Sequence, residues 1–277
     1  MKICDWIKQS SKKLSHINNC KFDLEILLSF VIKKDKIWIS MYDDFCLSID
    51  QINTLESFLL RRSRGEPLAY ILKNQEFWTL LLSVSKDTFI PRKDTELLIE
   101  VCLSILDKFN YNRILDLGSG SGSISLSIAK TKPDCHVVGV DYKREIISVS
   151  QYNAKKLNIS NVDFYVSNWF SSLYMMMFDI IVSNPPYISL NEFLLIREEL
   201  KYEPITSLVS YNNGFGDIKY IIKNSIQYLN PQGWLLLEHG YNQACMVKSF
   251  FEQFNYVNII TYQDYGNNDR ITIGQKR

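Results

Sequence analysis

The sequence has few of the features that mark metal-binding or disulfide-linked proteins. Its six cysteines are scattered and form no Cys-x-x-Cys pair; they stand at positions 4, 20, 46, 102, 135 and 245. The three histidines stand at no metal-ligand spacing from them. This pattern is typical of reduced, mostly buried thiols in a cytosolic protein, and it predicts no metal site.

Long apolar runs are also missing from the chain. No stretch of 18 apolar residues occurs, and the first ten residues hold no apolar run of signal-peptide length. We therefore expect a soluble, cytoplasmic protein that does not associate with a membrane.

The chain also carries almost no net charge. The sequence holds 31 Lys and Arg against 30 Asp and Glu, which leaves a formal charge of +1. This balance argues against a protein whose main task is to coat nucleic acid, although it leaves room for a local basic patch. The 277 residues, of which 46% are hydrophobic, suffice for one large or two modest globular domains. No internal repeat and no low-complexity tract occurs.

Residues 1–75 are expected to form a helical domain. Apolar residues recur at helical spacing over 22–32 and again over 55–60, and Asp50 is a candidate N-cap of the second helix. Lys and Arg outnumber Asp and Glu by 12 to 9 over residues 1–75, a surplus of three. A small helical domain with a mildly basic face is predicted to dock a partner rather than to catalyse a reaction.

Three arginines near the end of this region allow two interpretations. Arg61, Arg62 and Arg64 precede Gly65, and cations in a last helical turn followed by glycine are ordinary helix-stop chemistry. The same arginines could instead bind a partner, and both interpretations stay open at this point.

Residues 76–92 are predicted to be a hairpin that links two domains. Aromatic and β-branched residues are enriched over 77–84 and over 88–91, which favours two strands. An amphipathic helix is expected to follow from Asp94, with acidic residues in its first turn.

Residues 93–277 are predicted to be a catalytic domain of the α/β class. Strands and helices alternate from residue 113, which indicates a mostly parallel, Rossmann-like sheet with helices on both faces. The last two apolar runs lie too close together for a crossover helix, so they should pair antiparallel at one edge. The expected strands are 113–117, 135–141, 162–166, 178–183, 233–239, 257–262 and 270–273.

The strand at 178–183 leads into the segment Asn184-Pro185-Pro186-Tyr187. The prolines restrict the backbone and remove two donors, and the residue before a proline is held extended. Asn184 is therefore expected at the carboxyl end of its strand, where open α/β sheets bind ligands, with Tyr187 just behind it. The Asn184 oxygen and a proline carbonyl could hold an –NH2 group by its two hydrogens, with Tyr187 against its plane. The alternative is an ordinary polar strand end with a Pro-Pro turn.

A glycine-rich turn follows the first predicted strand: Gly118-Ser119-Gly120-Ser121-Gly122. Such a turn lets a ligand approach the backbone at a helix N-terminus. Asp141 ends the second strand, 21 residues after Gly120, where a carboxylate can accept from both ribose hydroxyls. A dinucleotide fingerprint would need glycine at 123 or 125, and both are serine. The turn also lacks a basic residue, so the pocket fits adenosine with a short cationic tail better than a pyrophosphate.

Asp116 and Trp169 have two interpretations each, and Asn168 has one. Asp116 either lies near the cationic tail or caps amides of the glycine turn. Trp169 either lies against a purine or covers the core, and Asn168 can accept from the exocyclic amine of that purine.

The assembled motifs resemble class I S-adenosylmethionine-dependent methyltransferases. These motifs are ILDLGSGSGSISLSIA at 114–129, Asp141 and Asn-Pro-Pro-Tyr at 184–187. Nearly the whole chain is similar to the bacterial release factor glutamine methyltransferase family (PrmC, or HemK). The further segments that carry this similarity are 61–71, 76–78, 90–96, 202–204 and 236–240.

The resemblance implies S-adenosyl-L-methionine as cofactor and N5-methylation of the glutamine in the Gly-Gly-Gln motif of peptide chain release factors. It places the cofactor contacts on Gly118, Ser119, Gly120, Ser121, Gly122, Asp141, Trp169 and Asn184. It places the substrate glutamine on Asn184, Pro185, Pro186 and Tyr187, with Asn184, Pro185 and Tyr187 as the catalytic residues. Two positions depart from the family pattern: Lys93, usually proline, and Asn168, commonly Asp.

Two other functions remain open. A nucleic-acid methyltransferase acting on adenine N6 or on ribosomal RNA shares the Asn-Pro-Pro-Tyr segment, but it should carry a strongly basic added domain or groove. Since the helical region carries a surplus of only three charges, we expect no direct need for nucleic acid. A cofactor-binding adaptor without catalysis is the second alternative, against which the intact segment argues.

Overall fold

The computed structural model describes residues 1–277 apart from the side chain of Glu199, and the chain divides into two compact units. The first unit is Met1–Asn74 and the second is Gln75–Arg277. Within the part of the chain that the structure describes, no helix is long and apolar enough to cross a membrane.

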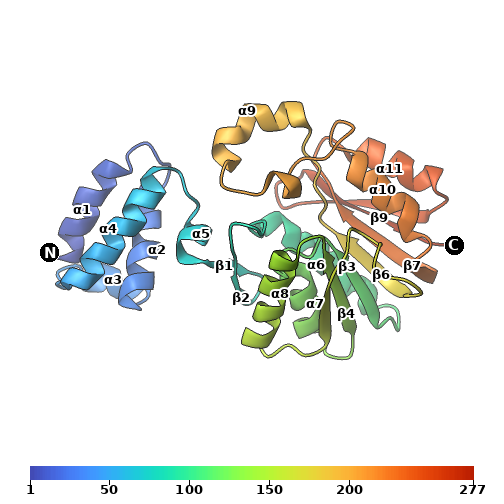
Figure 1. The fold of residues 1–277 in the computed structure, drawn as a ribbon, viewed down its shortest axis with the longest axis horizontal. Helices are drawn as coiled ribbons and strands as arrows, with labels where there is room; N and C mark the ends of the chain where they lie inside the picture. Colours follow the sequence, from blue (N-terminus) through green and yellow to red (C-terminus); the bar gives the residue numbers. More distant parts are fainter. The chain divides into compact units, whose positions relative to one another are not determined.

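The first unit is all helical (Figure 1). Its helices are α1 (Ile3–Lys13), α2 (Cys20–Ile32), α3 (Lys36–Met41), α4 (Ile49–Ser63) and α5 (Leu68–Leu72). A buried apolar cluster holds them together, with Trp6 of α1, Leu24 and Leu28 of α2 and Leu59 of α4 among its members. Burial of such side chains stabilises a small domain by about 1.5–3 kcal/mol each.

The prediction that Asp50 caps α4 was wrong. Ser48 is the N-cap, because its hydroxyl accepts from the Gln51 amide at 3.2 Å while Gln51 Oε1 accepts from the Ser48 amide at 2.9 Å. This reciprocal capping box satisfies two amides of the helix start, whereas Asp50 lies inside the first turn.

Two of the arginines at the end of α4 are bonded within the first unit. Arg61 donates to both carboxylate oxygens of Glu66, at 2.5 and 2.8 Å. Arg62 donates to Asp23 at 2.7 Å and to the Glu66 carbonyl at 3.1 Å. These bonds favour the structural interpretation of Arg61 and Arg62 over a partner-binding one.

The hairpin that precedes the large sheet lies earlier than predicted. Its strands are β1 (Asn74–Phe77) and β2 (Leu80–Ser83), joined by a tight turn in which Trp78 has a φ of 55°. The predicted second strand at 88–91 was wrong: these residues belong to no strand, and they follow a turn closed by the Thr88 amide, which donates to the Ser85 carbonyl.

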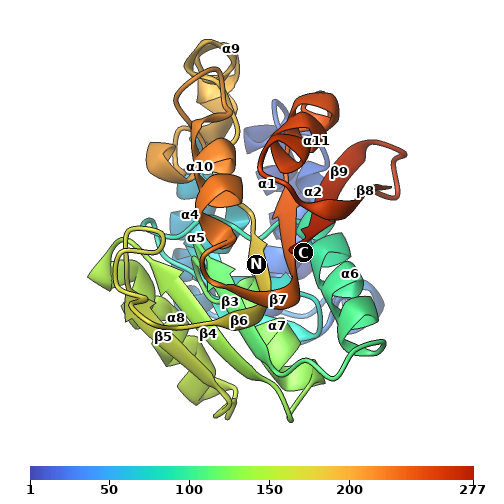
Figure 2. The same ribbon diagram turned by 90° about the vertical axis from the view of Figure 1, so that its right-hand side faces the viewer.

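The second unit is an α/β domain built on a seven-stranded sheet in the order β5-β4-β3-β6-β7-β9-β8 (Figures 1 and 2). The strands are β3 (Arg113–Leu117), β4 (His136–Asp141), β5 (Val162–Val166), β6 (Phe178–Ser183), β7 (Leu229–Glu238), β8 (Val257–Gln263) and β9 (Asp269–Gln275). The first five run parallel, and β9 pairs antiparallel with both β7 and β8. The predicted Rossmann-like sheet with an antiparallel edge is confirmed.

Helices cover both faces of this sheet (Figure 1). They are α6 (Glu96–Leu106), α7 (Ser123–Thr131), α8 (Arg144–Lys156), α10 (Gly216–Ser225) and α11 (Ala244–Gln253). The helix α9 (Leu190–Leu200) extends away from the sheet (Figures 1 and 2), and two 3-10 turns, η1 (Lys93–Thr95) and η2 (Ile205–Ser207), complete the unit. Strand residues alternate between two cores: Ile180 and Val182 pack with α6 and α7, whereas Ile181 packs with α10 and α11. This alternation follows from the period of two in a strand.

The strand order reverses between β3 and β6. From β3 the chain adds β4 and β5 on one side, and it returns to place β6 and β7 on the other. Because ligands bind at such a switch point, beyond the carboxyl ends of the strands, the loops after β3 and β6 are where a site is expected.

Candidate active site

A pocket opens at this switch point. It lies between the turn after β3, the end of β4 and the segment after β6. Most of the predicted site residues line it, namely Gly118, Ser119, Gly120, Ser121, Asp141, Trp169, Asn184, Pro185, Pro186 and Tyr187.

The glycine turn presents its backbone to the pocket because its glycines adopt left-handed conformations. Gly118 has a φ of 76° and Gly120 a φ of 55°. A Cβ added to Gly120 would meet no atom within 4 Å, so this residue borders open space. Gly122 does not line the pocket: it is buried, and a Cβ there would lie 2.9 Å from Leu126 Cδ1. Gly122 thus packs behind the turn, and its predicted cofactor contact stays a prediction.

Asp141 is held rigidly at the end of β4. Its Oδ2 accepts from the Gly120 amide at 3.0 Å, and its Oδ1 accepts from the Tyr142 amide at 2.8 Å. Burial raises the pKa of Asp141, and these amide hydrogen bonds oppose the rise. The carboxylate is thus oriented before any ligand arrives, with lone pairs left to accept from further donors.

Asp116 has a structural role, but it caps the helix after the glycine turn and not the amides of the turn itself. It is fully buried at the end of β3, outside the pocket lining, and its Oδ2 accepts from the Ser125 amide at 3.0 Å and from the Ser125 hydroxyl. Desolvation raises the pKa of Asp116 to about 7. Asp116 therefore caps the first turn of α7.

Trp169 lies beside the glycine turn. A Cβ added to Gly118 would lie 3.7 Å from Trp169 Cζ3, so the ring forms a wall of the pocket. The backbone of Trp169 has a φ of 51°, and its carbonyl accepts from the Ser167 hydroxyl at 2.7 Å. Strained backbone is retained where the surroundings compensate for it, often at binding sites. Asn168 lines a neighbouring hollow together with Trp169 and Asp141.

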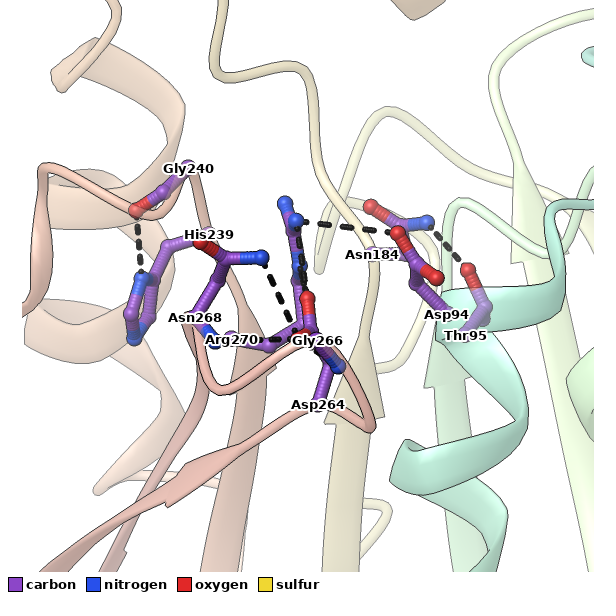
Figure 3. Close-up of polar contacts among 9 residues, drawn as sticks. All are labelled: Asp94, Thr95, Asn184, His239, Gly240, Asp264, Gly266, Asn268 and Arg270. Atoms are coloured by element: carbon purple, nitrogen blue, oxygen red, sulfur yellow. Dashed lines mark hydrogen bonds and ion pairs between the residues drawn. The ribbon is translucent and has the colours of Figure 1, made fainter.

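Asn184 is fixed by contacts on both sides. Ser183 pairs with Leu117 across β6 and β3, and its hydroxyl donates to the Leu117 carbonyl at 2.7 Å. Asn184 is therefore next to the start of the glycine turn, as predicted. Its Nδ2 donates to Thr95 Oγ1 of η1 at 3.1 Å (Figure 3).

Tyr187 is anchored through its backbone as well as its ring. Its carbonyl accepts from Gln243 Nε2 at 3.0 Å, and Gln243 Oε1 accepts from the Gly240 amide at 2.8 Å. Burial raises the pKa of the Tyr187 phenol far above its ordinary value, so the ring stays neutral. Gly214 packs against the same carbonyl so closely that a Cβ there would lie 2.2 Å from it.

The segment around η2 forms another wall that the sequence did not reveal. Thr206 of η2 and Tyr142, which follows β4, both line the pocket, and their hydroxyl oxygens are hydrogen-bonded at 2.6 Å. Glu203, which is 8% exposed, forms an ion pair with Arg92 and accepts from the Ile90 amide at 3.4 Å. The segments 90–96 and 202–204 carry the family resemblance, but no local pattern signals that residues 111 positions apart pair.

The fold and the pocket define a Rossmann-like methyltransferase. A methyltransferase-domain model matches residues 109–273, more than half of the chain. A methyltransferase from Pyrococcus furiosus has the same fold, at a TM-score of 0.52 and 17% identity, covering 81% of this chain and 98% of that one. The catalytic domain of hMettl16, solved in complex with the MAT2A 3'UTR hairpin 6, reaches a TM-score of 0.58 at 13% identity, covering 83% of this chain and 82% of that one.

Comparison with related sequences identifies the family within the methyltransferases. The release factor glutamine methyltransferase of Buchnera aphidicola subsp. Acyrthosiphon pisum is 46% identical over 276 residues, covering 100% of this chain and 99% of that protein. The protein of the same name from Escherichia coli is 39% identical over 270 residues, covering 98% and 97%. The PrmC N-terminal domain model matches residues 5–72. The chain belongs to the release factor glutamine methyltransferase family.

Proposed function

We propose that this protein transfers a methyl group from S-adenosyl-L-methionine to N5 of the glutamine in the Gly-Gly-Gln motif of peptide chain release factors. One observation carries the proposal: the Asn184 amide, bonded to Thr95, stands beside the glycine turn within one pocket. The full-length relatives that are named release factor glutamine methyltransferases support the choice of substrate.

The residues around the glycine turn suit an adenosine that carries a cationic sulfonium. The open space at Gly120 admits a ligand against the backbone, and the fixed Asp141 carboxylate can accept from the two ribose hydroxyls. Trp169 offers a ring face to the purine. A ribosomal RNA methyltransferase of T. thermophilus that shares this fold, at a TM-score of 0.51 and 18% identity, was solved with AdoMet. When bound, S-adenosylmethionine supplies an electrophilic methyl group.

The Asn-Pro-Pro-Tyr segment would hold the substrate carboxamide. An amide nitrogen is a poor nucleophile because its lone pair is delocalised into the carbonyl. Asn184 Oδ1 and the Pro185 carbonyl would accept from its two N–H groups and hold the nitrogen in one orientation. Positioning of this kind can contribute about 7–11 kcal/mol.

The same acceptors would stabilise the reacting nitrogen. Positive charge would build on this nitrogen as the new C–N bond forms and the methyl–sulfur bond breaks, with S-adenosylhomocysteine as the leaving group; oxygens already oriented by the fold need not reorganise. Tyr187 would pack on the amide plane and exclude water. The amide proton leaves after the transfer, and the neutral N5-methyl amide remains.

The two parts of the chain would divide the work. Residues 1–75 would dock the protein substrate, residues 76–92 would link the domains, and residues 93–277 would catalyse the transfer in the cytoplasm. A surplus of three positive charges over residues 1–75 suits a folded protein partner better than nucleic acid.

The test is methylation of a purified release factor by the wild-type protein and by Asn184→Ala, read as a mass increase on the Gly-Gly-Gln peptide. Losing one oriented acceptor should lower kcat by about 100- to 1,000-fold. Binding of S-adenosylhomocysteine should persist. Asn224→Ala is the matched control, because its amide donates to Tyr220 of its own helix, outside the pocket.

Parallel reactions with RNA and DNA distinguish the alternative substrate class. Label transferred by the wild-type protein to nucleic acid, with none on the release factor, would overturn the proposal. Wild-type activity in Asn184→Ala would overturn the assigned role of this residue.

A further inference from the structure

We propose that Glu238 is a positioning residue, which orients the Asn184 amide so that Asn184 Oδ1 faces the substrate nitrogen. The inference rests on the proposed function, because it assigns a task to a buried group beside the same site. None of the sequence motifs discussed above gives Glu238 a role of its own.

The register of the sheet brings Glu238 to Asn184. Ser183 pairs with Leu237 across β6 and β7, so the next residue on each strand lies at the same edge. Glu238 is 2% exposed, and its Oε2 has no hydrogen-bond partner among the described residues. A carboxylate this buried is retained only when its surroundings use it or compensate for it.

Glu238 and Thr95 form the acceptor side of one network with Asn184. Asn184 Nδ2 donates to Thr95 Oγ1 at 3.1 Å, and the side chains of Thr95 and Asn184 are among the groups that lower the pKa of Glu238. Since Thr95 Oγ1 accepts from the amide, its own proton is directed to the carboxylate. Thr95 therefore takes one Asn184 N–H group, and Glu238, at the same edge of the sheet, is the acceptor that we assign to the other.

This network selects one of the two amide orientations. An ionised carboxylate can only accept, so it attracts the Asn184 –NH2 and repels Oδ1. A flipped amide would place Oδ1 against Glu238 and present –NH2 to the substrate amide, which also offers N–H groups. That arrangement would leave no acceptor for the substrate nitrogen.

The selection depends on the charge of Glu238. Desolvation raises the pKa of Glu238 to about 7, and its hydrogen bonds and Arg270 oppose the rise. Asp94 on η1 raises this pKa further, and the charge of Glu238 in turn helps to raise the pKa of the Tyr187 phenol. Arg270 of β9 forms ion pairs with both Asp94 and Asp264. Its Nη2 lies 3.6 Å from Asp94 Oδ2 and 3.1 Å from Asp264 Oδ2 (Figure 3). Below the raised pKa a protonated Glu238 can itself donate to Asn184 Oδ1, so the preference for the productive orientation weakens.

The experiment compares full-length wild-type protein with Glu238→Gln in single-turnover methylation of a release factor from about pH 5.5 to about pH 9. The wild-type rate should fall as the pH drops through about 7. Glu238→Gln can donate as well as accept, so its rate should be about tenfold lower at high pH and should lack this fall. The KM for the release factor and the binding of S-adenosylhomocysteine should change by less than about twofold.

Two results would overturn the inference. One is a Glu238→Gln rate equal to that of the wild type. The other is a slow variant that keeps the acidic fall, which would assign that fall to another group such as Asp116, whose pKa is also raised to about 7. A wild-type protein inactive on release factors would instead refute the proposed function.

Thr95 provides a second route if Glu238→Gln does not fold. Thr95→Val keeps the shape but removes the hydroxyl that accepts from Asn184, so kcat should fall by about tenfold. Thr95→Ser restores the hydroxyl and should restore most of the rate, whereas a loss of packing would not be rescued. A wild-type rate in Thr95→Val would contradict the network.

Discussion

Two glycines of the turn after β3 should differ in how substitution by alanine affects stability and cofactor binding. Both have left-handed backbones, with a φ of 55° at Gly120 and 85° at Gly122. A Cβ at Gly120 would meet nothing within 4 Å, whereas one at Gly122 would lie 2.9 Å from Leu126 Cδ1, 3.1 Å from Phe164 Cζ and 3.2 Å from Ser150 Cβ. Comparing the Gly120→Ala and Gly122→Ala variants therefore separates the cost of backbone strain, which both share, from the cost of overpacking, which only Gly122→Ala has.

The expected losses of stability follow from this geometry. The left-handed conformation costs about 1–2 kcal/mol for alanine in either variant. Gly122→Ala adds overpacking of about 1–3 kcal/mol, because Ser150 Cβ is attached directly to the α8 backbone and can move little. Gly122→Ala should thus be the less stable variant by about 1–3 kcal/mol.

Cofactor affinity should show the reverse order. The Gly120 methyl would occupy pocket space beside Asp141, so S-adenosylhomocysteine should bind at least about tenfold more weakly. Gly122 lies behind the turn, so folded Gly122→Ala should bind within about threefold of the wild type. Urea unfolding gives the free energies of unfolding, and calorimetric titration gives the affinities. Equal destabilisation by the two variants, or tight binding by Gly120→Ala, would refute the reasoning.

Two further predictions concern charged groups of the second unit. Asp141→Asn loses a charged acceptor, so calorimetry should record S-adenosylhomocysteine binding weaker by about 1.5–3 kcal/mol; unchanged affinity would exclude the proposed ribose contact. Glu203→Gln breaks the ion pair with Arg92, which is partly exposed, so urea unfolding should record a loss of about 1–2 kcal/mol. Glu198→Gln is the control: it removes an exposed ion pair with Lys201 and should change the free energy of unfolding by less than about 0.5 kcal/mol. Equal losses of stability in the two variants would show that the burial of Glu203 does not strengthen its ion pair.

The sequence alone predicted the α/β sheet and most of the pocket. Strands and helices carry their periodicity locally, which is why 113–117, 162–166 and 178–183 matched β3, β5 and β6 residue by residue. The glycine turn and Asp141 were predictable for a related reason. Both lie at strand ends, and parallel strands place those ends at one edge of the sheet.

Where local signals competed, the sequence was a weaker guide. Asp50 and Ser48 are both good N-caps, and only the reciprocal bonds with Gln51 decided for Ser48. The run at 88–91 has strand-like composition, yet it forms no strand. Composition describes what a segment can do, and the neighbours it packs against decide between the options.

Only the tertiary structure decided how the site is supported. Asn184 meets Thr95 from 89 positions away, Glu203 meets Arg92 from 111 positions away, and Glu238 reaches Asn184 through the pairing of β6 with β7. The same pairing explains why Glu238 is buried, and burial is what raises its pKa to about 7. Local motifs specify which groups a chain carries, whereas the dielectric surroundings and partners of each group exist only once distant strands are packed together.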